Sequence, residues 1–104
     1  MTKQEHLTSG FQYFAQGEYD AAIRHFKSAL ELDERFEAAY SGLSESYNRR
    51  GDIDDAIPVV KKWIEINEND PLAHTALSRL YVQKGMIEEA EREMAISNYL
   101  SQQG

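Results

Sequence analysis

The feature that most constrains the fold is a short phrase that occurs three times at a fixed spacing of 34 residues. It appears as QGEYDAAI at 16–23, RGDIDDAI at 50–57 and KGMIEEAE at 84–91. A fixed period of this size indicates similar supersecondary units that stack on one another. The units are therefore expected at 3–36, 37–70 and 71–104. The spacing is kept by a tyrosine, a glycine and an alanine in each unit: Tyr13, Tyr47 and Tyr81; Gly17, Gly51 and Gly85; Ala22, Ala56 and Ala90.

Each unit is predicted to contain two helices separated by its glycine. In the middle unit, Tyr40, Leu43 and Tyr47 are spaced i, i+3 and i+7, which places them on one face of a helix. Gly51 is expected to end that helix, because glycine readily adopts the left-handed conformation that closes a helix C-terminus. Acidic residues after each glycine favour the start of the next helix, where they complement the positive end of the helix dipole. The sequence therefore predicts an all-α chain of three helix–turn–helix pairs.

These repeated residues resemble the tetratricopeptide repeat family, whose pattern is W-x2-L-G-x2-Y, then A-x3-F, then P, over 34 residues. The stretches AAIRHFKSALELD at 21–33 and AAYSGLSESYNRRGDIDDAI at 38–57 carry the resemblance best. It covers nearly the whole chain and implies a right-handed superhelical α-solenoid. It also implies a single domain over residues 1–104 with three repeats. The chain departs from the pattern at the tryptophan position, which holds His6, Tyr40 and His74.

Composition and charge limit the class of partner. The net charge is −7, whereas proteins that bind nucleic acids or anionic membranes carry clustered lysine and arginine. The chain contains no cysteine, which excludes disulfides, thiolate metal sites and cysteine nucleophiles. The stretch MTKQEHLTSG lacks the apolar run of a signal peptide, and no window is apolar enough to span a membrane. A cytoplasmic protein without nucleic-acid or membrane partners is therefore expected.

A search of the sequence for catalytic and metal-binding motifs finds none. The three histidines lack a metal-ligand spacing such as H-x-x-x-H, and His6 and His74 are expected to be packed inside the fold. The acids of GDIDDAI at 51–57 do not match the calcium loop of an EF-hand and are assigned to the helix start. No phosphate-binding glycine motif and no G-x-S-x-G motif occurs. The prediction is a protein that is not an enzyme and has no catalytic residue, no metal and no cofactor.

The resemblance also implies where a partner binds, since the first helix of each pair lines the concave face of a solenoid. On this basis the chain is expected to be an interaction scaffold that holds a partner peptide or helix in this groove. Leu7, Phe11 and Phe14 are spaced i, i+4 and i+7 and form one apolar stripe. Two interpretations of the stripe stay open: it anchors an apolar segment of the partner, or it only covers the N-terminal edge. The expected groove residues are Leu7, Phe11, Phe14, Ser41, Glu45, Asn48, Arg49, Thr75, Arg79, Val82 and Gln83.

Some members of the family bind the C-terminal carboxylate of a chaperone through a clamp of lysine, asparagine and arginine side chains. The matching positions of this chain hold no cation and no amide, so no carboxylate clamp is predicted. These positions are Leu7, Phe11, Gly42, Leu72 and Ala76.

The last helix suggests an alternative function. Glu91 and Asn98 are polar where the earlier units carry apolar residues, which favours a chain with its own C-terminal cap. Ile96, Tyr99 and Leu100, however, form an apolar i, i+3, i+4 patch on another face of the same helix. An uncovered apolar edge is a natural surface for self-association. The alternative hypothesis is a structural unit that forms homo-oligomers through this edge.

Overall fold

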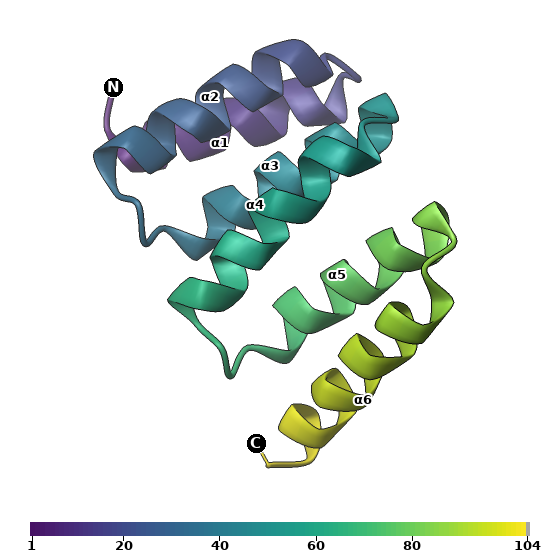
Figure 1. The fold of residues 1–104 in the computed structure, drawn as a ribbon. Coiled ribbons are helices and arrows are strands. Elements are labelled where there is room, and N and C mark those ends of the chain that lie inside the picture. Colours follow the sequence, from purple (N-terminus) through teal and green to yellow (C-terminus); the bar gives the residue numbers. More distant parts are fainter. Residues whose placement is uncertain (104) are drawn as a thin grey trace. The chain divides into compact units, whose positions relative to one another are not determined.

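The computed structural model describes residues 1–103, and six helices account for the secondary structure of that part of the chain (Figure 1). The observed helices follow the three predicted helix–turn–helix pairs, which confirms the all-α prediction. No helix of residues 1–103 combines the length and the hydropathy needed to cross a membrane. The helices are α1 (Lys3–Ala15), α2 (Tyr19–Leu32), α3 (Glu37–Arg50), α4 (Ile53–Ile66), α5 (Pro71–Lys84) and α6 (Ile87–Gln103).

The repeated glycines follow the ends of α1, α3 and α5, as the sequence predicts. Gly17, Gly51 and Gly85 have φ angles of 78°, 91° and 81°, in the left-handed region that side chains other than glycine rarely adopt. A Cβ atom at any of the three would meet no other atom within 4 Å, so backbone conformation rather than space requires glycine there. The next amide then closes the helix end, because the Asp52 N–H donates to the Tyr47 carbonyl at 2.8 Å.

Local signals also fix the starts of α1 and α5. The Thr2 hydroxyl accepts a hydrogen bond from the Glu5 N–H at 3.1 Å, and the Glu5 carboxylate accepts one from the Thr2 N–H at 2.8 Å. This reciprocal pair is a capping box, which satisfies two N–H groups that the first turn leaves unpaired. At α5, Asp70 caps the Leu72 N–H at 2.9 Å, and Pro71 occupies the first helical position.

The contacts between residues divide the chain into two compact units. Unit 1 comprises residues 1–52 with α1, α2 and α3, and unit 2 begins at Ile53 with α4, α5 and α6. In unit 1, α2 packs against both α1 and α3; in unit 2, α5 packs against both α4 and α6. The single domain over residues 1–104 stays a prediction.

The core of unit 1 is built around one phenylalanine that lies between two glycines. Phe26 of α2 is fully buried. A Cβ atom at Gly10 of α1 would lie 2.6 Å from its ring, and a Cβ atom at Gly42 of α3 would lie 2.4 Å from it. Both distances are far below the 3.5–4.0 Å or so of ordinary carbon contacts. The missing side chains at these two positions therefore allow α1 and α3 to approach the ring closely.

Candidate functional site

The predicted groove residues of α1 differ in how far they reach solvent. Leu7 is only 9% exposed, so it belongs to the helix packing more than to a free surface. Phe11 is 43% exposed, and its ring meets the Phe26 ring edge-on at 4.9 Å between centroids. Phe14 is half-buried and makes a similar edge contact with Tyr19 at 5.6 Å. The rings of Phe11 and Phe14 on α1 are thus held by edge contacts with Phe26 and Tyr19, while part of their surface stays accessible.

An ion pair of α3 lies beside this aromatic surface. The Arg49 guanidinium carbon is 5.6 Å from the centre of the Phe14 ring, within the range of a cation–π contact. The same guanidinium donates from Nε to the Glu45 carboxylate at 3.1 Å, one helical turn earlier. Phe11, Phe14, Glu45 and Arg49 therefore form one surface on α1 and α3, called the unit 1 patch below. Its aromatic half offers apolar contacts. Its charged half offers the guanidinium of Arg49 as a donor group and the carboxylate of Glu45 as an acceptor group.

The other two predicted groove residues of α3 are less accessible than Arg49. Ser41 and Asn48 are half-buried. The Ser41 carbonyl accepts a hydrogen bond from the Ser44 hydroxyl at 3.0 Å. The Asn48 carbonyl accepts one from the Gly51 N–H at 3.0 Å. Both bonds use the backbone carbonyls of these residues and not their side chains.

In unit 2, the four predicted groove residues all lie on α5. Thr75 is tied to the neighbouring helix, because its hydroxyl oxygen lies 2.6 Å from that of Ser97 on α6. Arg79, Val82 and Gln83 are exposed, and Val82 reaches 54%. This part of the predicted groove is open and mixed in character. The binding role of the eleven groove residues remains a prediction.

The positions that would carry a carboxylate clamp are equally varied. Leu72 is exposed, Ala76 is half-buried, and Gly42 faces the Phe26 ring instead of a ligand. The absence of a carboxylate clamp stays a prediction.

Two contacts of histidine side chains join the helices of a repeat and were not found from the sequence. In unit 1, the Nδ1 atoms of His6 and His25 lie 3.0 Å apart, at hydrogen-bond distance; the tautomers decide which ring donates. Burial, together with the charges of His6 and Arg24, lowers the pKa of His25. In unit 2, His74 and Glu93 occupy the equivalent positions two periods later, with Nδ1 and Oε2 2.7 Å apart. His74 is buried, as predicted, whereas His6 is half-buried.

The histidine pair of unit 1 does not amount to a metal centre. Among residues 1–103, no group of three or more histidine, aspartate or glutamate side chains could hold a metal ion. The ring of Tyr13 stacks on that of His25, with centroids 5.5 Å apart and planes inclined by 13°. This packing makes the pair part of the contact between α1 and α2.

The residues predicted for self-association lie along the outer part of α6. Ile96 and Tyr99 are 40% and 61% exposed, whereas Leu100 is half-buried. At the corresponding positions the earlier repeats carry Ser28 and Glu31 or Lys62 and Glu65. Apolar side chains at these two positions are thus a special property of the third repeat. Whether they join two copies stays a prediction.

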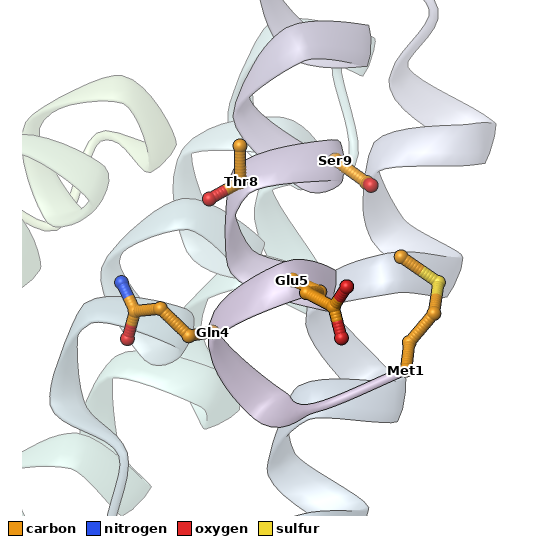
Figure 2. Close-up of a pocket in the computed structure, with 5 residues that line it drawn as sticks. All are labelled: Met1, Gln4, Glu5, Thr8 and Ser9. Carbon is orange, nitrogen blue, oxygen red and sulfur yellow. The ribbon is translucent and has the colours of Figure 1, made fainter.

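An open hollow of about 280 Å³ lies on α1, and none of its lining residues belongs to the predicted groove (Figure 2). Figure 2 shows hydroxyl, amide and carboxylate side chains beside the thioether of Met1 around this hollow. The lining residues are Met1, Gln4, Glu5, Thr8 and Ser9.

Helix pairs that repeat every 34 residues, each with a left-handed glycine between its two helices, define an α-helical repeat protein. A family model described as tetratricopeptide repeat matches residues 13–80 and, in a second placement, residues 49–97. The chain belongs to the tetratricopeptide repeat family, as the sequence resemblance suggested. No curated protein matches the chain by sequence comparison.

Solved structures with the same fold include several named proteins. MamA superposes with a TM-score of 0.93 at 24% identity, and the match covers 98% of this chain and 60% of MamA. The type III secretion translocator chaperone SycD of Yersinia enterocolitica gives 0.90 at 21% identity, with 94% and 73% covered. The first TPR domain of Spaghetti (RPAP3), bound to the HSP90 peptide SRMEEVD, gives 0.91 at 18% identity, with 99% and 82% covered. The chain thus spans about three fifths of the length of MamA, and the TM-scores establish the shared fold.

Proposed function

We propose that this chain is a protein-interaction scaffold that binds a partner peptide or helix on the first helices of its repeats. The observation that carries the proposal is the unit 1 patch, in which Phe11 and Phe14 stay accessible beside the Glu45–Arg49 pair. Family membership supports it, since tetratricopeptide repeats are generally scaffolds without catalytic activity. So do two structural neighbours, because Spaghetti is bound to an HSP90 peptide and SycD to a peptide of the translocator YopD.

The chemistry of the unit 1 patch favours an amphipathic partner segment. Fully burying a phenylalanine side chain is worth about 1.5–3 kcal/mol, so covering the exposed 43% of Phe11 contributes about 1 kcal/mol. Arg49 is anchored by both Phe14 and Glu45, so it can donate hydrogen bonds to a carboxylate or carbonyl of the partner without losing much further side-chain freedom. An apolar side chain placed over Phe11 and an acceptor placed over Arg49 would satisfy both halves of the patch.

The proposal also includes the class of partner and the compartment. A net charge of −7 favours a protein or peptide over a nucleic acid or an anionic membrane. We propose a cytoplasmic protein that is not an enzyme and that uses no metal or cofactor.

A peptide-library selection tests the proposal. Random peptides are displayed against the full chain, and the affinities of the selected peptides are measured by isothermal titration calorimetry. Phe11→Glu should lower the affinity for the selected peptides at least tenfold. Leu32→Glu changes an exposed apolar residue of α2 in the same unit and should leave them unchanged. Peptides that bind Phe11→Glu as well as the wild type would show that the groove on α1 is not the binding surface.

A second candidate function is self-association through Ile96, Tyr99 and Leu100. The specific observation is the exposure of Ile96 and Tyr99 at positions that are polar in both earlier repeats. One structure of SycD, described as an alternative dimer, supports homo-oligomers on this fold. Analytical ultracentrifugation from low micromolar to high micromolar concentration should then show an oligomer that Tyr99→Glu abolishes. A single monomeric species over the whole range would eliminate this candidate.

A further inference from the structure

A second apolar surface lies on α5 and α6 of unit 2, apart from the residues of the unit 1 patch. It is an open hollow of about 320 Å³, called the C-terminal hollow below. Val82 and Ile87 at its rim are 54% and 50% exposed, although both are aliphatic. The third helix of this unit, α4, supplies none of its lining residues. It is lined by Ser78, Val82, Ile87, Ala90, Glu91 and Met94.

The first repeat shows what covers this face of a repeat. Two periods earlier than Ser78 and Met94 stand Gly10 and Phe26. Phe26 is fully buried because α3 packs across α2 and brings Gly42 against its ring. In unit 2, α5 packs on α4 in the same way: the first helix of one repeat covers the second helix of the repeat before it. The C-terminal hollow therefore has the geometry of a face that receives one more helix.

The two helices that already occupy such positions share a residue pattern. In α3 it consists of Ala39, Gly42, Leu43 and Ser46, and in α5 of Ala73, Ala76, Leu77 and Leu80. All eight are buried or half-buried. The hydroxyl of Ser46 donates to the Gly42 carbonyl at 2.8 Å, so its polar group is satisfied without water. A helix that fits this kind of face thus carries small residues at n and n+3, leucine at n+4 and a leucine or serine at n+7.

One residue of the C-terminal hollow selects the charge of its occupant. Glu91 stands where the earlier repeats have the buried residues Ile23 and Ile57. Within residues 1–103 it forms no ion pair, whereas the nearby Glu89 is paired with Arg92. A helix that covers Glu91 leaves a carboxylate without its water unless the helix supplies a cation. The occupant is therefore expected to carry lysine or arginine at the edge of its small-residue face.

The exposed face of α1 argues against a second copy of this chain as the occupant. The positions that correspond to the pattern of α3 and α5 hold Glu5, Thr8, Ser9 and Gln12. Figure 2 shows three of these polar residues, Glu5, Thr8 and Ser9, which line the hollow on α1. Head-to-tail stacking of two copies would bury these polar side chains on an apolar surface and bring Glu5 toward Glu91.

We propose that the C-terminal hollow binds a cationic amphipathic helix of another protein, with the small-x-x-small-leucine pattern on its buried face. This site is separate from the proposed peptide groove, apart from Val82, which borders both.

The probe for this proposal is a synthetic helical peptide with the face Ala-x-x-Ala-Leu-x-x-Leu, lysines flanking that face and a fluorescent label. Binding to the full chain is followed by fluorescence anisotropy. Ile87→Glu should weaken the probe at least tenfold, while Leu72→Glu, an exposed apolar position of α5 outside the hollow, should not change it. Far-UV circular dichroism confirms that both variants keep their helices.

The charge part of the proposal has its own test. Glu91→Lys should weaken the lysine probe at least tenfold and favour a probe with glutamate in place of lysine, whereas Glu88→Lys on the same helix should have little effect. Phe11→Glu should leave the probe's affinity unchanged, so failure of the groove proposal is distinguishable from failure of this one. No binding of either probe, or equal binding by Ile87→Glu, would overturn the proposal. A dimer that Ile87→Glu abolishes would overturn it in favour of a second copy.

Discussion

Gly42→Ala is the most direct test of how the core of unit 1 is built. The new Cβ would lie 2.4 Å from Cζ and 2.5 Å from Cε1 of Phe26. Carbon atoms prefer about 3.5–4.0 Å, so the ring or α3 must move by about 1 Å. The ring has little room to move, because α1 also approaches it closely: a Cβ at Gly10 would lie only 2.6 Å from Cε1. The substitution should therefore separate α3 from α2.

Two opposing terms set the magnitude. Overpacking a well-packed core costs about 1–3 kcal/mol, and the close contacts on both sides of Phe26 place this case near the upper end. Replacing glycine by alanine within a helix returns about 1 kcal/mol. The expected net loss in the free energy of unfolding is about 1–2 kcal/mol, which corresponds to a fall in Tm of about 5–15 °C for a chain of this size.

Urea unfolding followed by circular dichroism measures this loss, with Ser41→Ala as a control for helix propensity at the neighbouring position. Phe26→Leu on the Gly42→Ala background should recover stability relative to the sum of the two single changes, with a coupling of at least about 0.5 kcal/mol. If Gly42→Ala unfolds at the same urea concentration as the wild type or a higher one, the close approach of α3 to Phe26 is wrong.

Three further predictions concern other features. Gly51→Ala places a methyl group in open space, so backbone strain alone should cost about 1–2 kcal/mol in urea unfolding, and Gly51→Asn should cost less. Thr2→Ala removes the capping box of α1 and should lower the free energy of unfolding by about 1 kcal/mol; an unchanged value would contradict the cap. As the pH is lowered from about 7.5 to 5.5, the free energy of unfolding should decrease, because the pKa of His25 is lowered from 6.5 in the folded chain and the unfolded chain therefore binds more protons. His25→Gln should flatten this pH dependence in urea titrations at the two pH values, and an unaltered slope would refute the assignment.

Sequence periodicity predicted the helices well because it reports local backbone geometry. Gly17, Gly51 and Gly85 need left-handed backbone, and that need depends on each glycine's own turn, so a repeated residue is enough to place it. Proline after aspartate at 70–71 likewise specifies a helix start from neighbouring residues alone.

The candidate site was harder to predict, because accessibility depends on the packing of neighbouring helices. Leu7 and Phe11 belong to the same apolar stripe, yet Leu7 is buried and Phe11 is exposed. Residue spacing defines a face of α1, but the side chains brought close by α2 and α3 decide how much of that face stays free. The His6–His25 contact shows the same limit, since it joins residues that no motif relates.

The polar face of α1 and the C-terminal hollow on α6 give the chain a direction. Attaching a further repeat before residue 1 would place Glu5 and Thr8 under an apolar helix, whereas attaching one after α6 would cover Val82, Ile87 and Met94. Gene fusion or engineered extension of this protein should therefore succeed at one end and fail at the other. Arrays built from it would lengthen only by adding repeats at the C-terminal end.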